Sequence, residues 1–155
     1  MSYSFAKLYL KSNRSIGIAF WHLQFNTKYR YKMFSKFKYK SLIEACIRQV
    51  CTKHKFKIVV IKVMPDHVHM MVQTSINISP VRVCQLIKGG SSYLFFKYHP
   101  KARLRYPRGH LWSPGKFMAS IGFTDFDFTL SYILHQEEHH ASSLINSSQR
   151  GNQVL

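Results

Sequence analysis

Acidic side chains and cysteines are scarce in this sequence. Six Asp and Glu stand against 23 Lys and Arg, a formal net charge of +17, and such an excess is typical of proteins that bind a polyanion. Cys46, Cys51 and Cys84 are odd in number and form no CxxC pair, which argues against a disulfide framework and against a zinc ribbon. We therefore expect the cysteines to be small core residues.

Long apolar runs are also missing from the 155 residues. No stretch reaches the roughly 18 apolar residues of a membrane-spanning helix, and the segment 16–21 is too short and poorly flanked for a signal peptide. We expect a cytoplasmic protein without a membrane partner, whose polyanion is nucleic acid. The 46% hydrophobic content suits one domain over 1–155, with a core at about 15–144 and a loose polar tail at about 147–155.

The spacing of apolar residues predicts a mixed fold of strands and helices. The strands are expected at Ser15–Phe25, Lys55–Val63, His67–Thr74 and Lys116–Phe123, and the helices at Lys40–His54, from Ser79 to about Phe95, and from Leu130, capped by Thr129, to about Leu144. This order suits an α+β fold, a ferredoxin-like or RRM-like antiparallel sheet with helices on one face. A C-terminal helix that carries a tyrosine is added to it.

Two histidines, His67 and His69, flank Val68 at the start of one predicted strand. Alternate side chains of a strand share a face, so both imidazoles should point the same way. Neutral imidazoles suit Zn, Mn, Fe or Ni. Taken alone, a His-x-His pair is weak support for a metal site, because polar residues on half-exposed strand faces are common.

Tyr132 and Gln136 lie four residues apart, a spacing that stacks them on one face of the last predicted helix. A tyrosine that attacks a phosphodiester stores the cleaved bond as a phosphotyrosine, which a DNA hydroxyl can reverse. A glutamine carbonyl favours hard cations such as Mg²⁺ or Mn²⁺, and a ligand set of His67, His69 and Gln136 is electrically neutral. For one tyrosine among nine, anchoring the helix in the core is the competing interpretation.

Three more histidines, His135, His139 and His140, follow Tyr132. His135 and His139 are spaced like the pairs of helical zinc sites, but no HExxH pattern is present. One of the three remains an alternative or additional ligand to Gln136; otherwise they face DNA or solvent. Asp66 is expected to be a turn residue rather than a ligand.

Basic residues interleaved with aromatics over 28–40, and the basic loop 101–108, are the expected DNA contacts. A solvated charged surface with aromatic residues in the core is the competing interpretation, which the net charge disfavours. The expected DNA-binding residues are Lys28, Arg30, Lys32, Lys88, Arg103, Arg105 and Arg108.

The sequence resembles the single-tyrosine HUH transposases of small bacterial and archaeal insertion sequences, the TnpA-like and REP-associated tyrosine transposases. HUH denotes histidine, a hydrophobic residue and histidine, and the resemblance covers roughly residues 15–140. The motifs that carry it are Met64-Pro65-Asp66-His67-Val68-His69, Leu86-Ile87-Lys88-Gly89-Gly90-Ser91-Ser92, Leu111-Trp112-Ser113 and Tyr132-Ile133-Leu134-His135-Gln136-Glu137-Glu138-His139-His140. Lys116 is a departure, because related sequences often carry an aromatic residue there.

The resemblance implies that Tyr132 becomes linked to the 5′ phosphate of cleaved single-stranded DNA and that the free 3′ hydroxyl performs strand transfer. It implies that His67, His69 and Gln136 hold a divalent cation, Mg²⁺ or Mn²⁺. The implied partners are DNA hairpins at element ends and a second subunit, with active sites completed in trans. The implied location is the prokaryotic cytoplasm, with the chromosomal DNA.

Two other functions remain open at this point. A noncatalytic ferredoxin-like module could use the basic surface to bind nucleic acid, and it would not need the hydroxyl of Tyr132. A relaxase-like or replication-initiator nickase would use the same chemistry, but such enzymes usually have longer chains and often a second tyrosine.

Overall fold

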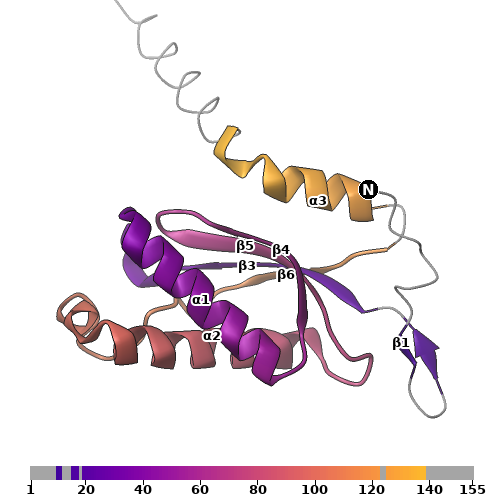
Figure 1. The fold of residues 1–155 in the computed structure, drawn as a ribbon, viewed down its shortest axis with the longest axis horizontal. Coiled ribbons are helices and arrows are strands. Elements are labelled where there is room, and N and C mark those ends of the chain that lie inside the picture. The colour runs from indigo at the N-terminus through magenta and orange to yellow at the C-terminus, as the bar shows by residue number, and fades with distance from the viewer. Residues whose placement is uncertain (1–9, 12–14, 18, 123–124, 139–155) are drawn as a thin grey trace, which may run out of the picture.

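A four-stranded antiparallel sheet with the strand order β4-β5-β3-β6 lies at the centre of the molecule. The structure is a computed structural model that describes residues 10–11, 15–17, 19–122 and 125–138. The sheet consists of β3 (Phe20–Asn26), β4 (Lys57–Val63), β5 (His67–Gln73) and β6 (Phe117–Ser120), and the helices are α1 (Phe37–Lys53), α2 (Pro80–Tyr98) and α3 (Phe126–Leu134). Figure 1 shows α1 and α2 on one face of the sheet and α3 on the other.

The order β3-α1-β4-β5-α2-β6 is the β-α-β-β-α-β arrangement of ferredoxin-like folds. It confirms the predicted α+β fold, including the hairpin of β4 and β5 and the added helix. Strand β5 lies between β4 and β3, with elements covering both of its faces, and all seven of its residues are buried. The histidine motif therefore opens the most enclosed strand of the sheet.

The face under α1 and α2 carries the main apolar core. Val68, Met70 and Val72 alternate along β5 and are fully buried there. The two helices approach closely, because a Cβ on Gly90 of α2 would come within 2.7 Å of the Val50 side chain on α1. None of the helices in the described ranges is long and apolar enough to cross a membrane.

Helix α3 covers the opposite face through a smaller apolar cluster. Phe126 packs edge-on against Phe20 of β3 with ring centroids 5.2 Å apart, and Met71, Ile121 and Ile133 complete the buried cluster. The remaining positions of β3 and β5 on this face are largely polar. Chemistry and packing therefore share one side of the sheet.

Several predicted boundaries were wrong. Strand β4 begins at Lys57 rather than Lys55, and β6 is Phe117–Ser120 rather than Lys116–Phe123. The first predicted strand is two strands, β2 (Ile16–Gly17), which pairs with β1 (Leu10–Lys11), and β3. Strand β5 ends at Gln73, the register partner of Phe20, and one further backbone hydrogen bond follows this pair, from the Thr74 amide to the Ala19 carbonyl oxygen at 3.0 Å. The other two corrections concern helix starts.

Helix α1 begins at Phe37, three residues before the predicted start, and α3 begins at Phe126 with Asp125 in the N-cap position. Thr129 is therefore inside α3 and does not cap it. The Phe126 ring packs on Phe20 of β3, so α3 begins four residues before the predicted start at Leu130. Ser79, by contrast, caps α2 as predicted: its hydroxyl oxygen accepts a hydrogen bond from the Arg82 amide at 3.2 Å.

The cysteines are buried free thiols, which confirms their expected place in the core. Burial raises the pKa of Cys46 to about 11 and that of Cys51 to about 12. Thiols with such pKa values are largely protonated and unreactive at neutral pH.

Candidate active site

The two histidines of the motif lie side by side on the sheet face that α3 covers. His67 and His69 are 4% and 3% exposed, and their ring centroids are 5.0 Å apart. His67 is registered with Asn26 of β3, and His69 with Gln24. The alternation of the strand thus places both imidazoles on one polar surface, as expected for alternate residues.

Asp66 orients the His67 ring. Nδ1 of His67 lies 2.6 Å from Asp66 Oδ1, and Arg30 Nε lies 3.1 Å from Oδ2 of the same carboxylate. Burial by itself would raise the pKa of Asp66, but the hydrogen bond from His67 and the charge of Arg30 outweigh it, so this pKa lies below its ordinary value. An ionised Asp66 accepts the Nδ1 proton, which fixes the tautomer and the orientation of the His67 ring.

His22 contacts the other histidine, and sequence analysis missed it. Its Nε2 lies 3.4 Å from Nδ1 of His69, and the two rings are stacked with centroids 5.7 Å apart. Burial lowers the pKa of His22. This contact restricts the orientation of the His69 ring, as the Asp66 contact does for His67. The signal that could have found His22 is the alternation of polar residues with Gln24 and Asn26 along β3.

Tyr132 reaches the same surface from α3. Its side chain is 41% exposed, and its ring lies edge-on to those of His22 and His69, at centroid distances of 6.1 and 6.2 Å. A hollow of about 380 Å³ opens beside it, lined by His22, Gln24, Phe117, Phe128, Thr129 and Tyr132. The structure therefore brings the predicted nucleophile against one predicted ligand and leaves space for a substrate.

Gln136 follows a break in the last helix. Helix α3 ends at Leu134, His135 has φ −98° and ψ 18°, and residues 136–138 are helical again. The Gln136 side chain is buried, and its Nε2 donates to the carbonyl oxygen of Tyr132 at 3.2 Å. The four-residue spacing thus couples the amide of Gln136 to the backbone of the tyrosine.

Glu137, in the helical segment that follows α3, forms ion pairs with a lysine of β4 and a lysine of α1. Its Oε1 lies 3.4 Å from Nζ of Lys62 and 3.4 Å from Nζ of Lys40, and Lys62 is the register partner of His69. The Lys62 ammonium, and then that of Lys40, hold the pKa of Glu137 below its ordinary value. These ion pairs keep the segment that carries Gln136 over the polar face of the sheet.

The donor atoms of this face suit a divalent cation. The Nδ1 atoms of His67 and His69 both have partners, and among the described residues Oδ1 of Asn26 is buried without a hydrogen-bond partner. A buried carbonyl oxygen without a partner is an atom that a ligand can satisfy. In the described ranges, no group of three His, Cys, Asp or Glu side chains is placed to hold a metal. The donors present are imidazoles and amides.

The histidines after Tyr132 are only partly described. His135 is exposed, and its Nδ1 lies 2.7 Å from the carbonyl oxygen of Ser131, so it donates to its own helix. His139 and His140, the predicted helix end near Leu144 and the predicted tail lie outside the described residues.

The basic residues predicted to bind DNA differ in their surroundings. Arg30 pairs with Asp66, and Nζ of Lys88 donates to the carbonyl oxygens of residues 113, 114 and 115 at 2.7, 3.5 and 3.2 Å. Burial, and then the charge of Lys116, lowers the pKa of Lys88. The others are half-buried or exposed: Lys28, Lys32, Arg103, Arg105 and Arg108. Their contact with DNA stays a prediction.

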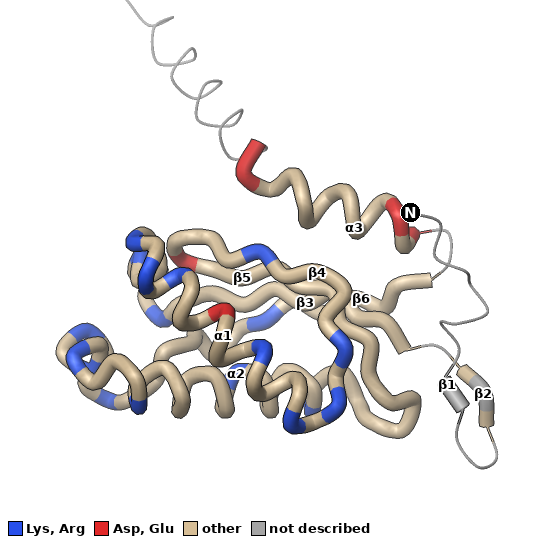
Figure 2. The backbone as a smooth tube through the Cα atoms, in the orientation of Figure 1, with Lys and Arg blue, Asp and Glu red and all other residues tan. Residues whose placement is uncertain are grey.

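The charges of the molecule are segregated. Figure 2 shows the basic residues over α1, α2 and the ends of the sheet, and acidic residues at both ends of the α3 segment. Residues 125–138 carry four acids and no Lys or Arg. The helix that carries Tyr132 is thus an acidic element on a basic body.

Comparisons of the sequence with known proteins agree on one family. The family described as "Transposase IS200 like" matches residues 19–136. The chain is 24% identical to the IS200 transposase of Salmonella typhimurium over 118 residues, 76% of each chain. It is also 24% identical to the ISDra2 transposase TnpA of Deinococcus radiodurans over 122 residues, 78% of this chain and 86% of the relative.

Two solved structures share the fold. A protein of Deinococcus radiodurans described as a transposase superimposes with a TM-score of 0.65 at 23% identity, over 82% of this chain and 98% of the other. A REP-associated tyrosine transposase bound to a REP hairpin superimposes with a TM-score of 0.59 at 17% identity, over 84% of this chain and 74% of the other.

Proposed function

This chain belongs to the IS200-like transposase family, and we propose that it nicks and rejoins single-stranded DNA at the ends of an insertion sequence through a covalent 5′-phosphotyrosine. The observation that carries the proposal is the position of Tyr132, edge-on to His22 and His69 beside an open hollow. A core tyrosine could not meet a phosphodiester, whereas this hydroxyl belongs to a side chain that is 41% exposed.

The reaction begins when the phenolic oxygen of Tyr132 attacks the scissile phosphorus. A bond forms between this oxygen and phosphorus while the bond from phosphorus to the 3′ oxygen breaks. The proton that the phenol loses is balanced by the proton that the departing 3′ oxygen gains. The 5′ phosphate stays on Tyr132, and a 3′ hydroxyl of the strand to be joined reverses the same steps without water or ATP.

His67 and His69, with Gln136 as the third ligand, would hold the divalent cation, Mg²⁺ or Mn²⁺. When bound, such a cation supplies positive charge to the phosphate oxygens. Asp66 and His22 fix the ring orientations through the two Nδ1 atoms. The protein's own contribution is therefore to hold donors and nucleophile in fixed positions around one phosphate.

The expected DNA is a single strand with a hairpin at each element end, and the expected assembly is a homodimer with tyrosine helices exchanged between subunits. Support for the hairpin comes from the related REP-associated transposase, whose structure contains a REP hairpin. Support for exchange comes from the small apolar cluster under α3, which holds this helix less firmly than the main core holds α1 and α2.

The direct test incubates the purified protein with labelled single strands from the DNA that flanks its gene, with Mg²⁺ or Mn²⁺. We expect a denaturation-resistant protein-DNA adduct that EDTA prevents. Tyr132→Phe should abolish the adduct and retain DNA affinity, while Tyr98→Phe, at an exposed tyrosine of α2, should behave as wild type. No adduct from either protein, together with a DNA affinity that Tyr132→Phe leaves unchanged, would instead favour the noncatalytic binding module.

A further inference from the structure

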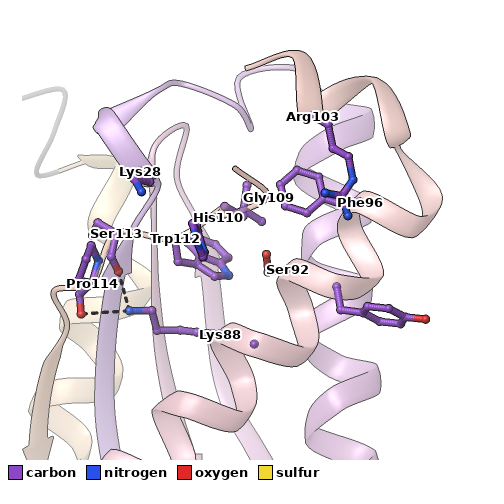
Figure 3. Close-up of a pocket in the computed structure, with 13 residues that line it drawn as sticks. Lys28, Lys88, Ser92, Phe96, Arg103, Gly109, His110, Trp112, Ser113 and Pro114 are labelled. Carbon is purple, nitrogen blue, oxygen red and sulfur yellow. Dashed lines mark hydrogen bonds between the residues drawn. The ribbon is translucent and has the colours of Figure 1, made fainter. Parts of the chain in front are cut away.

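A second hollow lies beside the segment that leads into β6. It has a volume of about 530 Å³ and is formed between α2 and residues 109–114. Figure 3 shows Lys28 and Arg103 at its rim, with Ser92 and Trp112 between them. None of the described residues that line it is Asp or Glu. Neither the family match nor the chemistry of Tyr132 accounts for this pocket.

The walls of the pocket combine flat apolar surfaces with positive charge. The indole of Trp112 is fixed by a hydrogen bond from Nε1 to the buried Ser91 hydroxyl at 3.0 Å, and the Arg103 guanidinium lies 4.9 Å from the centre of the Phe96 ring. Figure 3 shows the Ser92 hydroxyl directed into the space between Trp112 and Phe96. Aromatic walls, a cationic rim and one hydroxyl suit a nucleobase with its phosphate.

Hydrogen bonds at both ends of the 109–114 segment keep the pocket open. The Lys88 ammonium joins α2 to three consecutive carbonyl oxygens, beginning with that of Ser113. The amide of Lys28 donates to the Leu111 carbonyl oxygen at 2.8 Å, and Thr27 forms an isolated bridge with Trp112. A pocket formed in advance orders little on binding, which favours affinity.

The pocket is close to the hollow that contains Tyr132. Pro114 lines the pocket, and Phe117, three residues later, lines that hollow. Three residues of extended chain span at most about 11 Å, the length of about three stacked nucleotides at 3.4 Å each. Between them lies Lys116, which is exposed. A single strand can therefore cross this segment from one hollow to the other.

We propose that the pocket between α2 and residues 109–114, the base pocket, receives one unpaired DNA base within about three nucleotides of the phosphate that Tyr132 attacks. The proposal rests on the proposed nicking function and adds to it a contact that selects DNA sequence. The size of the pocket and the Ser92 hydroxyl would discriminate among bases. The cations at the rim, Lys28 and Arg103, would contact the flanking phosphates.

A space-filling variant tests the proposal with little risk to folding. Gly89 lines the base pocket, and a Cβ there would meet no atom within 4 Å, so Gly89→Leu extends into open space and replaces a poor helix former. The matched control is Gln85→Leu, at an exposed position one turn earlier on α2 that does not line the pocket. Both are made in Tyr132→Phe protein, so that no strand is cut.

Affinity is measured by fluorescence anisotropy with labelled (dT)12 and (dA)12. Gly89→Leu should weaken binding about tenfold, the order of magnitude expected when one enclosed base is lost. Gln85→Leu should stay within about twofold of its parent. Equal affinities of Gly89→Leu and its parent for both oligonucleotides would overturn the base pocket.

Tryptophan fluorescence gives a second and independent measurement. The chain has two tryptophans, so Trp21→Phe leaves Trp112 of the base pocket as the reporter. Saturating (dT)12 should change the Trp112 emission of the parent, and Gly89→Leu should suppress that change. Binding without any change would contradict the proposal.

Failure of the base pocket and failure of the nicking function are distinguishable. The covalent adduct of wild-type protein reports nicking, and the binding experiments with Tyr132→Phe need no cleavage. An adduct without an effect of Gly89→Leu would discard the base pocket alone. No adduct, together with a Gly89→Leu effect, would leave a single-strand binding site in a protein that does not cut.

Discussion

The two faces of the sheet use the same strand for different purposes. Towards α1 and α2, β5 presents Val68, Met70 and Val72, which are fully buried in the main apolar core. Towards α3, the same strand presents His67 and His69. A shift of one residue in register would exchange the two sets, so the core on one face fixes the positions of the imidazoles on the other.

The two faces of the sheet therefore differ in what they contribute to stability and to chemistry. The face under α1 and α2 is continuous apolar packing, the dominant source of stability in folded proteins. The face under α3 combines a small apolar cluster with hydrogen-bonded histidines. Substitutions on the first face should change stability, and those on the second should change activity.

Replacing His69 should abolish activity. His69→Ala removes a proposed ligand and the contact of Tyr132 with that ring, so we expect the DNA adduct to disappear while the free energy of unfolding changes by about 1 kcal/mol. Adduct formation and urea denaturation measure the two effects. The control is His54→Ala, at the half-buried C-cap residue of α1, which should keep the adduct. A wild-type adduct yield in His69→Ala would contradict the assignment of activity to the sheet face under α3.

Replacing Phe95 should lower the stability of the protein far more than replacing His69. Phe95 is completely buried in the core under α2. Phe95→Ala should therefore lower the free energy of unfolding by about 3–5 kcal/mol. Phe128→Ala, at a 76% exposed phenylalanine of α3, is the comparison from the other face and should lower it by less than about 1 kcal/mol. Chemical denaturation measures both, and equal losses would contradict the division.

Replacing Asp66 should weaken metal binding without loosening the fold. Asp66→Asn keeps the size of the side chain but removes the charge that holds the Nδ1 proton of His67, so Mn²⁺ affinity should fall by about 10- to 100-fold. Asp127→Asn, at an exposed carboxylate of α3, is the control. Calorimetric titration with Mn²⁺ gives the affinities, and an unchanged value in Asp66→Asn would remove this orienting role.

The smallest effect concerns the ion pairs that hold the segment after α3. Because the pKa of Glu137 is lowered in the folded state, its stabilising contribution is complete above its ordinary value of 4.5 and is lost as the pH falls below it. The pairs are solvent-exposed, so the contribution should not exceed about 1 kcal/mol.

Glu137→Gln should therefore make the stability of the α3 segment depend slightly less on pH in the acid range. Glu44→Gln is the control and should leave the hydrogen exchange of the α3 amides unchanged. Hydrogen exchange over residues 126–138 at pH 7 and at pH 4 measures the effect. A Glu137→Gln protein in which exchange keeps the same pH dependence as wild type would show that these ion pairs do not hold the segment.

Much of the fold follows from local signals. The alternation along β5, the turn at Pro65 and Asp66, and the cap at Ser79 are each decided by neighbouring residues, and the structure confirms all of them. The start of α3 depends on a contact between Phe126 and Phe20, more than a hundred residues apart in sequence. No local pattern reports such a contact, which is why this boundary was wrong.

The candidate site also combines residues that local signals can suggest with residues that only tertiary contacts bring in. His67, His69 and Tyr132 could be proposed from spacing and chemistry together with the family resemblance, and in the structure the ring of Tyr132 lies edge-on to that of His69. The role of His22 depends on the pairing of β3 with β5, and the partners of Lys88 depend on the path of residues 113–115. Such contacts come from tertiary structure, so a list of basic or polar residues cannot rank them.

If Tyr132 is the nucleophile, its hydroxyl oxygen becomes bonded to the 5′ phosphate of the cleaved DNA. The direct measurement is mass spectrometry of the proteolysed adduct formed with a single-stranded substrate and Mg²⁺ or Mn²⁺. We expect one nucleotide-modified peptide, with the added mass on Tyr132. A modification on any other residue, or strand cleavage that leaves every peptide unmodified, would contradict it.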